Sequence, residues 1–260
     1  MSGFTGQRWW VVGASSGLGR EIARQLVQEG AHVLASARSR DALLSLSREA
    51  DGIEALPMDV TDPVSVEAAA TRAGLPDGVI YAAGAYEPMR AQDWQPGVAE
   101  AVADVNFTGA LRVLSHLIPK MAARGAGRVV LIGSLAGFRG LPGAIGYGAS
   151  KSALMHLAEN LRADLVGTGV IVQRVNPGFI RTRLTAKNSF AMPQIMEPEE
   201  AARRTLSAIR RGRFSKSFPA PFAWLFTLGR FLPLPIFHAL FRTSGDQTPG
   251  TPDRKGNEEA

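Results

Sequence analysis

The sequence has 260 residues, 45% of them hydrophobic, which is enough to bury the core of one α/β domain. Because it contains no cysteine, disulfide frameworks and thiolate metal sites are excluded, and we expect a cytoplasmic protein. The net charge of +6 comes without a nucleic-acid-binding motif, so we expect no nucleic acid partner and an anionic cofactor or membrane surface instead.

The first predicted elements are a strand, a glycine-rich turn and a helix. Arg8–Val12 (RWWVV) is rich in β-prone residues, and Gly13–Gly19 (GASSGLG) follows it directly. The amphipathic helix has apolar positions at Ile22, Leu26 and Val27. Glycines in such a turn let the backbone approach a pyrophosphate, and the helix N-terminus offers unpaired N–H groups. The alternative is an ordinary tight turn, which the flanking strand and helix disfavour.

The second predicted strand, Ala31–Ala37, is followed by two arginines, Arg38 and Arg40. In dinucleotide-binding folds an acidic residue at this strand end accepts the ribose 2′-hydroxyl, whereas an arginine pairs with a 2′-phosphate. Arg38 therefore predicts that NADP(H) is preferred over NAD(H). The alternative is that both arginines are solvated loop charges.

Three further strands are predicted at Leu56–Val60, Val79–Gly84 and Arg128–Ile132, with a helical run over Gly97–Leu117. Strands that are apolar almost throughout indicate a parallel sheet covered on both faces. Ligands bind such sheets beyond the carboxyl ends of the strands, which is where Ser134 lies. Taken alone, a serine after a strand is more often a turn or capping residue.

Tyr147 and Lys151 are four residues apart at the predicted start of the next helix. Residues at this spacing share a helix face, so the phenol and the ammonium group can point into one site. A lysine beside a tyrosine favours the phenolate and lowers its pKa toward the range useful for proton transfer. The alternative is a solvated helix surface, where this spacing is common.

The remaining elements are a strand at Val170–Val175, a loop at Arg181–Ile195 of the kind that closes over a substrate, and a helix at Pro198–Arg211. Phe214–Phe218 is a candidate last strand. The four histidines stand singly, without the spacing of metal ligands, so no metal site is expected.

The segment 219–242 is unusually rich in Phe, Leu and Trp. Arg230 and four prolines interrupt it, so it is too broken to span a bilayer. Three roles stay open: a lid over the active site, a homodimer face, or a pair of short helices lying on a membrane surface. Each of them makes the neighbourhood apolar, which favours a lipid-like, steroid-like or aromatic substrate. The predicted divisions are 1–218 for the catalytic domain, 219–243 for the apolar segment and 244–260 for a disordered polar tail.

Over residues 7–213 the sequence resembles the short-chain dehydrogenase/reductase family. The resemblance rests on GASSGLG, AAG, VNFTG, the spacing of Ser134, Tyr147 and Lys151, and Asn176-Pro177-Gly178 followed by Thr182. It implies an α/β, Rossmann-like, doubly wound parallel sheet in a single domain, with the apolar segment as a C-terminal helical extension. It also implies a catalytic tetrad of Asn106, Ser134, Tyr147 and Lys151.

The resemblance assigns further residues to the cofactor, beside Arg38 and the tetrad members Asn106, Tyr147 and Lys151. They are Gly13, Ser15, Ser16, Gly17, Leu18 and Gly19 at the pyrophosphate, Asp59 and Val60 at the adenine, Ala83 and Gly84 at the adjoining ribose, and Pro177, Gly178, Ile180 and Thr182 at the nicotinamide.

The implied reaction is reversible hydride transfer between the nicotinamide and a carbonyl or carbinol carbon. Ser134 would bind the substrate oxygen and Tyr147 would act as general acid or base. Lys151 would bind the nicotinamide ribose and lower the tyrosine pKa, and Asn106 would hold a water that links Lys151 to solvent. Two alternatives stay open: an NAD-dependent dehydrogenase that oxidises a hydroxysteroid or sugar alcohol, and a non-catalytic nucleotide sensor.

Three departures from the family pattern concern structure rather than proton transfer. Val12 stands where a threonine commonly precedes the first glycine, and Tyr81-Ala82 stand where two asparagines often precede Ala-Gly. The glycine-rich end strand that many tetrameric members use at their interface is missing, so tetramer assembly is not expected from the resemblance.

Overall fold

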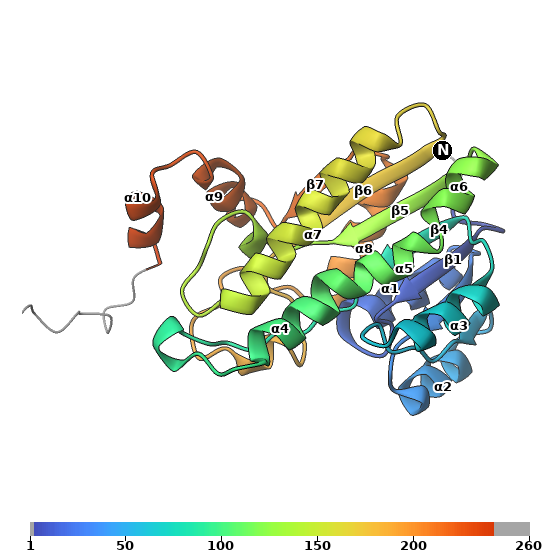
Figure 1. Cartoon of the computed structure of the whole chain (residues 1–260), viewed down its shortest axis with the longest axis horizontal. Helices are drawn as coiled ribbons and strands as arrows, with labels where there is room; N and C mark the ends of the chain where they lie inside the picture. Colours follow the sequence, from blue (N-terminus) through green and yellow to red (C-terminus); the bar gives the residue numbers. More distant parts are fainter. Residues whose placement is uncertain (1–2, 242–260) are drawn as a thin grey trace, which may run out of the picture.

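Seven parallel strands form one sheet in the order β3-β2-β1-β4-β5-β6-β7 in the computed structural model, which describes residues 3–241 (Figure 1). The strands are β1 (Arg8–Val12), β2 (His32–Ser36), β3 (Ile53–Ala55), β4 (Gly78–Tyr81), β5 (Gly127–Ile132), β6 (Val170–Pro177) and β7 (Ser215–Phe218). The order runs outward from β1 in both directions, so β1 and β4 flank the point where the winding reverses. A ligand crevice is expected at this point, beyond the carboxyl ends of the strands.

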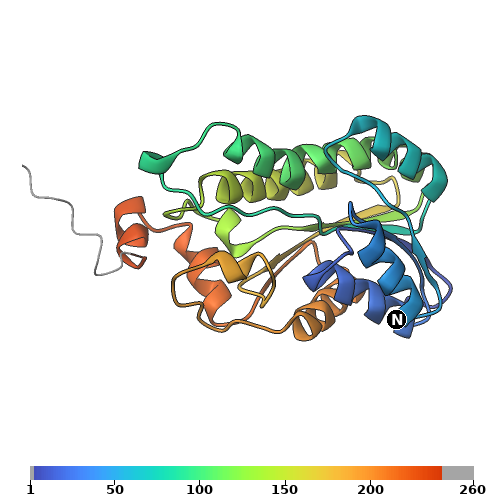
Figure 2. The same cartoon turned by 90° about the horizontal axis from the view of Figure 1, so that it is seen from below.

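Helices cover both faces of the sheet (Figure 2). They are α1 (Gly17–Gln28), α2 (Arg40–Glu49), α3 (Pro63–Ala73), α4 (Val98–Ala103), α5 (Gly109–Ser115), α6 (Ile118–Arg124), α7 (Ile145–Asp164), α8 (Pro198–Arg210), α9 (Phe222–Gly229) and α10 (Leu234–Ala239). The doubly wound, single-domain α/β fold predicted from the sequence is confirmed.

Alternation along β1 divides the core into two clusters. Trp9 and Val11 pack on the face covered by α1, α2 and α8, whereas Trp10 and Val12 pack on the face covered by α3, α5, α6 and α7. Successive side chains of a strand point to opposite faces, so a strand buried on both sides is apolar at every position. This explains why RWWVV, which the sequence predicts as a strand, shows no polar alternation.

The predicted third strand at Leu56–Val60 is wrong, because β3 is the short segment before it, Ile53–Ala55. The chain beyond β3 still follows β2, since the amides of Leu56 and Met58 donate to carbonyls of β2 and the residue after it. Pro57 between them has no N–H group to contribute. Extended backbone was therefore predicted correctly, but the strand itself was placed too late.

The predicted helical run over Gly97–Leu117 consists of three pieces instead of one helix. One turn of π-helix, Asp104–Thr108, separates α4 from α5 and carries Asn106. Such wide turns inside α-helices are rare and occur often at functional sites. Apolar periodicity predicts the helical face but does not reveal a local change from α to π geometry.

The C-terminal segment forms two short helices, α9 and α10, as the membrane-surface hypothesis assumed, and both lie at the end of the molecule where α7 begins (Figure 1). Their inner side chains form a third apolar cluster with Leu135 and Phe138, which follow β5. Among residues 3–241, no helix is long and apolar enough to cross a bilayer. The tail predicted to be disordered, 244–260, lies outside the described residues.

Candidate active site

The four tetrad residues predicted from the sequence converge at the carboxyl ends of β4 and β5. Ser134 follows β5, Tyr147 and Lys151 lie on the first turns of α7, and Asn106 lies on the π-helical turn. Asn106 is fully buried and Lys151 is 4% exposed. Burial of this many polar groups requires that each finds a hydrogen-bond partner, and the partners define the geometry of the site.

Asn106 connects the start of α7 to the segment after β4. Its Oδ1 accepts from the Ala85 amide at 2.6 Å, and its Nδ2 donates to the Ala85 carbonyl at 3.0 Å and to Ser150 Oγ at 2.9 Å. Ser150 Oγ in turn donates to the Tyr147 carbonyl at 2.9 Å. Both amide hydrogens of Asn106 are therefore in use, so a water relay at this residue has to bind to an oxygen.

The Ser134 side chain lies close enough to the Tyr147 phenol to lower the pKa of Tyr147. Burial has the larger effect, however, and raises the pKa of Tyr147 above its ordinary value of 10.0. The Lys151 Nζ lies 6.0 Å from the centroid of the Tyr147 ring and donates to the Ile132 carbonyl at 2.8 Å. The pKa of Tyr147 is therefore raised, whereas the spacing to Lys151 predicted a lowered pKa, because the effect of burial exceeds the opposing effect of Ser134.

The residues predicted to bind the cofactor lie along the same edge of the sheet. Gly13–Gly19 follow β1, Arg38 follows β2, Asp59 and Val60 lie after β3, Ala83 and Gly84 follow β4, and Pro177, Gly178, Ile180 and Thr182 lie at or after the end of β6. A Cβ atom on Gly84 would lie 3.7 Å from Asn106 Oδ1 and 3.8 Å from Lys151 Nζ, so the segment after β4 adjoins the tetrad.

The glycine loop has the shape and polarity of an anion site. Gly17 has a φ of 55°, and a Cβ on it would lie 2.8 Å from the Thr182 methyl group, so the loop after β6 packs directly against this turn. The Ser16 side chain makes no capping bond to α1, and the first turn of α1 carries no acidic residue. N–H groups at such a helix end can hold a phosphate. These residues fit a dinucleotide pyrophosphate.

Arg183 is a residue at this loop that the sequence analysis missed. Its Nη2 donates to Ser16 Oγ at 2.9 Å, across 167 positions of the chain. The guanidinium group thus lies beside the N-terminus of α1, where an anion would bind. A basic side chain directly after Thr182 was the available signal in the sequence, but nothing in its spacing shows that it reaches back to the glycine loop.

On the adenine side, Asp59 is held by the amide and the hydroxyl of Thr61, at 2.9 and 2.8 Å. Burial raises the pKa of Asp59, but the Thr61 hydrogen bonds and the charges of Arg38 and Arg112 outweigh it, and the net pKa is lowered. Arg38 is exposed, and its charge lies near enough to Asp59 to lower the pKa of that carboxyl group. This position fits a group that binds a charged substituent at the edge of the cofactor site.

Tyr86 is a second residue that the sequence analysis missed. Its ring meets the Tyr147 ring edge-on, with centroids 5.0 Å apart, and its hydroxyl donates to Asn188 Oδ1 at 2.8 Å. Lys187 pairs with Glu87 beside it. The loop at Arg181–Ile195 is therefore bonded to Tyr86 and Glu87, next to the Tyr147 ring.

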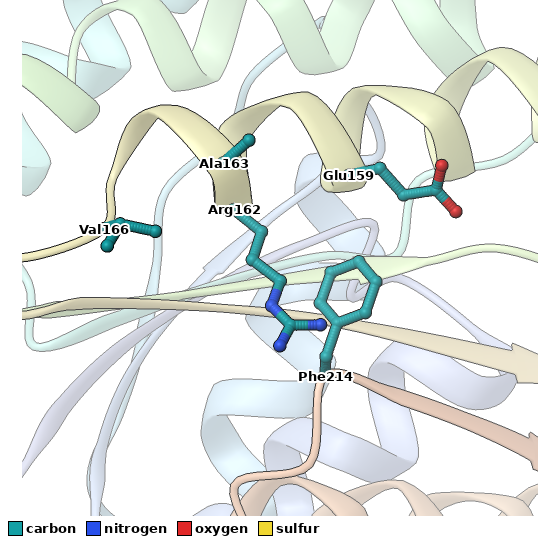
Figure 3. A pocket seen from close by; sticks show the side chains of 5 residues that line it. All are labelled: Glu159, Arg162, Ala163, Val166 and Phe214. Atoms are coloured by element: carbon teal, nitrogen blue, oxygen red, sulfur yellow. The ribbon is translucent and has the colours of Figure 1, made fainter.

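A surface hollow on the far half of α7 is not part of this site (Figure 3). It is lined by Glu159, Arg162, Ala163, Val166 and Phe214. The Arg162 guanidinium group lies 4.5 Å from the Phe214 ring centroid, which is a cation–π contact that packs α7 against the segment before β7. Glu159 is twelve residues from Tyr147 along one helix, or ~18 Å at 1.5 Å per residue.

The sequence model of a family described as short chain dehydrogenase matches residues 8–192. A Myxococcus xanthus protein described as an uncharacterized oxidoreductase is 39% identical over 240 residues, which cover 89% of this chain and 95% of that protein. A Staphylococcus haemolyticus protein with the same description is 30% identical over 76% of this chain and 89% of its own length.

Solved structures give the same result. A short chain dehydrogenase from Burkholderia cenocepacia in complex with NADP is similar with a TM-score of 0.83 and 27% identity, over 93% of this chain and all of that one. A putative betaketoacyl-ACP reductase is similar with a TM-score of 0.74 and 29% identity, over 82% of this chain and 95% of that one.

The burial of Lys151 predicts a specific pH dependence of stability. Burial lowers its pKa from 10.5 to about 8. Above pH 8 the unfolded chain binds more protons at this residue than the folded chain. The contribution of Lys151 to the free energy of unfolding therefore rises with pH, by at most about 1.4 kcal/mol per pH unit. The measurement is urea unfolding of the wild type and Lys151→Met from pH 7 to 9.5. The wild type should gain stability relative to the variant above pH 8, and a constant or falling difference contradicts the assignment.

Proposed function

We propose, from the premise that the chain belongs to the short-chain dehydrogenase family, that it interconverts a carbonyl and a secondary alcohol by hydride transfer with NADP(H). The chain is an NAD(P)-dependent oxidoreductase, as its family and relatives establish. The single observation that carries the finer proposal is the convergence of the tetrad: the buried Lys151 lies 6.0 Å from the Tyr147 ring centroid, and a Cβ on Gly84 would lie within 4 Å of both Lys151 Nζ and Asn106 Oδ1.

When bound, NADP(H) donates or accepts the hydride. Ser134 binds the substrate oxygen, and Tyr147 gives its phenolic proton to the oxygen as negative charge develops there. Lys151 holds the ribose hydroxyls of the cofactor. Asn106 positions α7 through Ser150, which keeps Tyr147 and Lys151 facing the same point.

Two arginines bind the phosphates of the cofactor in this proposal, and only one of them distinguishes NADP(H) from NAD(H). Arg38, at the end of β2, pairs with the 2′-phosphate, and the NADP in the Burkholderia cenocepacia structure supports this choice by analogy. Arg183 lies against Ser16 and binds the diphosphate that NADP(H) and NAD(H) share. Arg38 therefore determines the preference for NADP(H) over NAD(H), and Arg183 increases the affinity for both cofactors.

The substrate in this proposal is a small apolar carbonyl or alcohol. Leu135 directly follows Ser134, and it packs in one apolar cluster with Phe222, Phe226 and Phe237 of the C-terminal helices. A carbonyl that reaches Ser134 therefore approaches along apolar side chains, which gain from covering an apolar molecule. The proposal also includes a cytoplasmic enzyme in peripheral contact with a membrane through 219–242, and it leaves the choice between monomer and homodimer open.

Tyr147→Phe tests the catalytic assignment. Removing the phenolic proton should lower turnover with a panel of apolar ketones and aldehydes by about 10²–10⁴-fold while NADPH binding, followed by fluorescence titration, stays unchanged. Tyr86→Phe is the matched control, because it removes a neighbouring hydroxyl and should reduce turnover far less. Near-normal turnover in Tyr147→Phe would contradict the assignment of Tyr147 as general acid.

Arg38→Ala tests the cofactor preference. Loss of one charge-assisted phosphate contact should weaken NADPH binding by about tenfold or more and leave NADH binding nearly unchanged. Equal affinity of the wild type for both cofactors would instead make Arg38 a solvated loop residue. The oxidative, NAD-dependent reaction would then become the leading function.

Arg183→Ala should weaken NADPH and NADH by similar factors, because the diphosphate is common to both. Arg181→Ala is the control: this neighbouring arginine is exposed and pairs with Glu197, away from Ser16. The same fluorescence titrations measure all three proteins. If Arg183→Ala binds both cofactors as tightly as the wild type, Arg183 does not bind the pyrophosphate.

A further inference from the structure

Helices α9 and α10 carry large apolar side chains on the side that faces away from the protein. Trp224 is 60% exposed and Phe231 is 72% exposed. We call these two and their neighbours the outer apolar face, which consists of Trp224, Leu228, Phe231, Leu234, Ile236 and Leu240. An apolar surface that is contiguous along the chain, rather than scattered, marks a site of interaction with another protein or a membrane.

The opposite side of the same helices is already packed. Ala223, Phe226, Gly229 and Phe237 are buried, and a Cβ on Gly229 would lie 2.8 Å from the Phe237 ring. The two helices are thus held to each other and to the domain without the outer apolar face. A surface helix of a soluble domain normally presents polar side chains outward, so helices that are apolar on both sides require a second apolar environment.

The charge of this part of the chain selects the partner. From residue 211 to 241 the sequence contains no aspartate or glutamate but four arginines and lysines: Arg211, Arg213, Lys216 and Arg230. Arg230 lies within the outer apolar face, with its guanidinium group 4.7 Å from the Phe231 ring centroid. Aromatic and aliphatic side chains with arginine among them suit the boundary between acyl chains and anionic headgroups. A second copy of the chain would bring the same positive charge to the contact.

We infer that α9 and α10 dock this protein on the surface of an anionic lipid bilayer, with the outer apolar face entering the acyl-chain boundary. Both views show the two helices at one end of the molecule, projecting from the layers that enclose the sheet (Figures 1 and 2). A projecting apolar element can enter a bilayer without any groove in the partner. Insertion in the plane of the interface also agrees with helices of only 8 and 6 residues.

Docking places the substrate side of the catalytic centre at the lipid surface, a step that rests on the proposed function. Arg139 donates to the Leu232 carbonyl, and His238 Nε2 lies 3.1 Å from the Gly140 carbonyl oxygen. Arg139 and Gly140 belong to the segment between Ser134 and Tyr147, so the helix pair contacts the catalytic segment directly.

A run of aromatic rings continues this contact toward the loop at Arg181–Ile195. The rings of Phe190 and Phe179 have centroids 5.9 Å apart, those of Phe179 and Phe222 are 5.6 Å apart, and those of Phe222 and Phe226 are 5.1 Å apart. An apolar substrate leaving the bilayer beside α9 would therefore meet aromatic side chains up to the loop that crosses the site.

The test is co-sedimentation of the full chain with vesicles of phosphatidylcholine, with and without phosphatidylglycerol. The variant combines Trp224→Ser, Leu228→Ser and Phe231→Ser. The matched control combines Val64→Ser, Leu111→Ser and Val166→Ser, three exposed apolar residues on other elements. Wild type and control should bind phosphatidylglycerol vesicles, the variant should bind at least about tenfold more weakly, and added salt should weaken binding of all three.

Wild type that stays in the supernatant, or a variant that binds like the control, overturns the inference. The inference is also overturned if light scattering shows that the wild type is a dimer and the variant a monomer, while neither protein binds lipid. The outer apolar face would then be covered by a second copy of the chain. NADPH titration of each protein verifies the fold. Lipid binding is measured without substrate, so vesicle binding without carbonyl reduction contradicts only the proposed hydride transfer. Reduction without vesicle binding contradicts only the membrane contact.

Discussion

The close approach of the glycine loop to the end of β4 is the constraint on which the rest of the site depends. A Cβ on Gly13 would lie 2.4 Å from the Ala83 amide nitrogen, and one on Gly19 would lie 2.2 Å from the Gly13 carbonyl oxygen. Only glycine permits this packing, which draws the start of α1 and the segment after β4 together at the point where the sheet winding reverses. The pyrophosphate site and the tetrad become neighbours because these two backbone segments touch.

Catalytic geometry is then set by buried polar bonds rather than by the acidity of any single residue. Asn106 satisfies three hydrogen bonds between the π-helical turn, the Ala85 backbone and Ser150, so the start of α7 cannot shift without leaving a buried amide unpaired. Burial has a cost for the reacting groups, because it raises the pKa of Tyr147 and lowers that of Lys151. Tyr147 is thereby held in its neutral form, and Lys151 titrates closer to neutral pH, which leaves the charge distribution sensitive to what binds beside them.

The fold could be predicted from the sequence where a single local rule decides, as in the apolar run of β1, the glycine loop and the Tyr147–Lys151 spacing. The prediction failed at β3, where apolar residues indicated a strand at Leu56–Val60 but only Ile53–Ala55 pair as one. It also failed at Tyr147, where burial raises a pKa that was expected to be lowered. Arg183 and Tyr86 were missed for a different reason. Their partners, Ser16 and Asn188, lie 167 and 102 positions away, and no spacing in one sequence encodes such contacts.

The C-terminal helices show how one apolar segment can serve two environments. Their inner residues complete a cluster with Leu135 and Phe138, so the segment is anchored to the catalytic domain at the residue next to Ser134. Folding therefore buries only the inner apolar side chains of these helices. The exposed ones lower the stability of the fold in water, because they are ordered without being buried. The proposed contact with lipid would remove that cost, at the place where an apolar substrate would be most concentrated. The composition of 219–241 thus follows from two faces: the buried side chains pack beside Ser134, and the exposed side chains form the surface proposed to contact lipid.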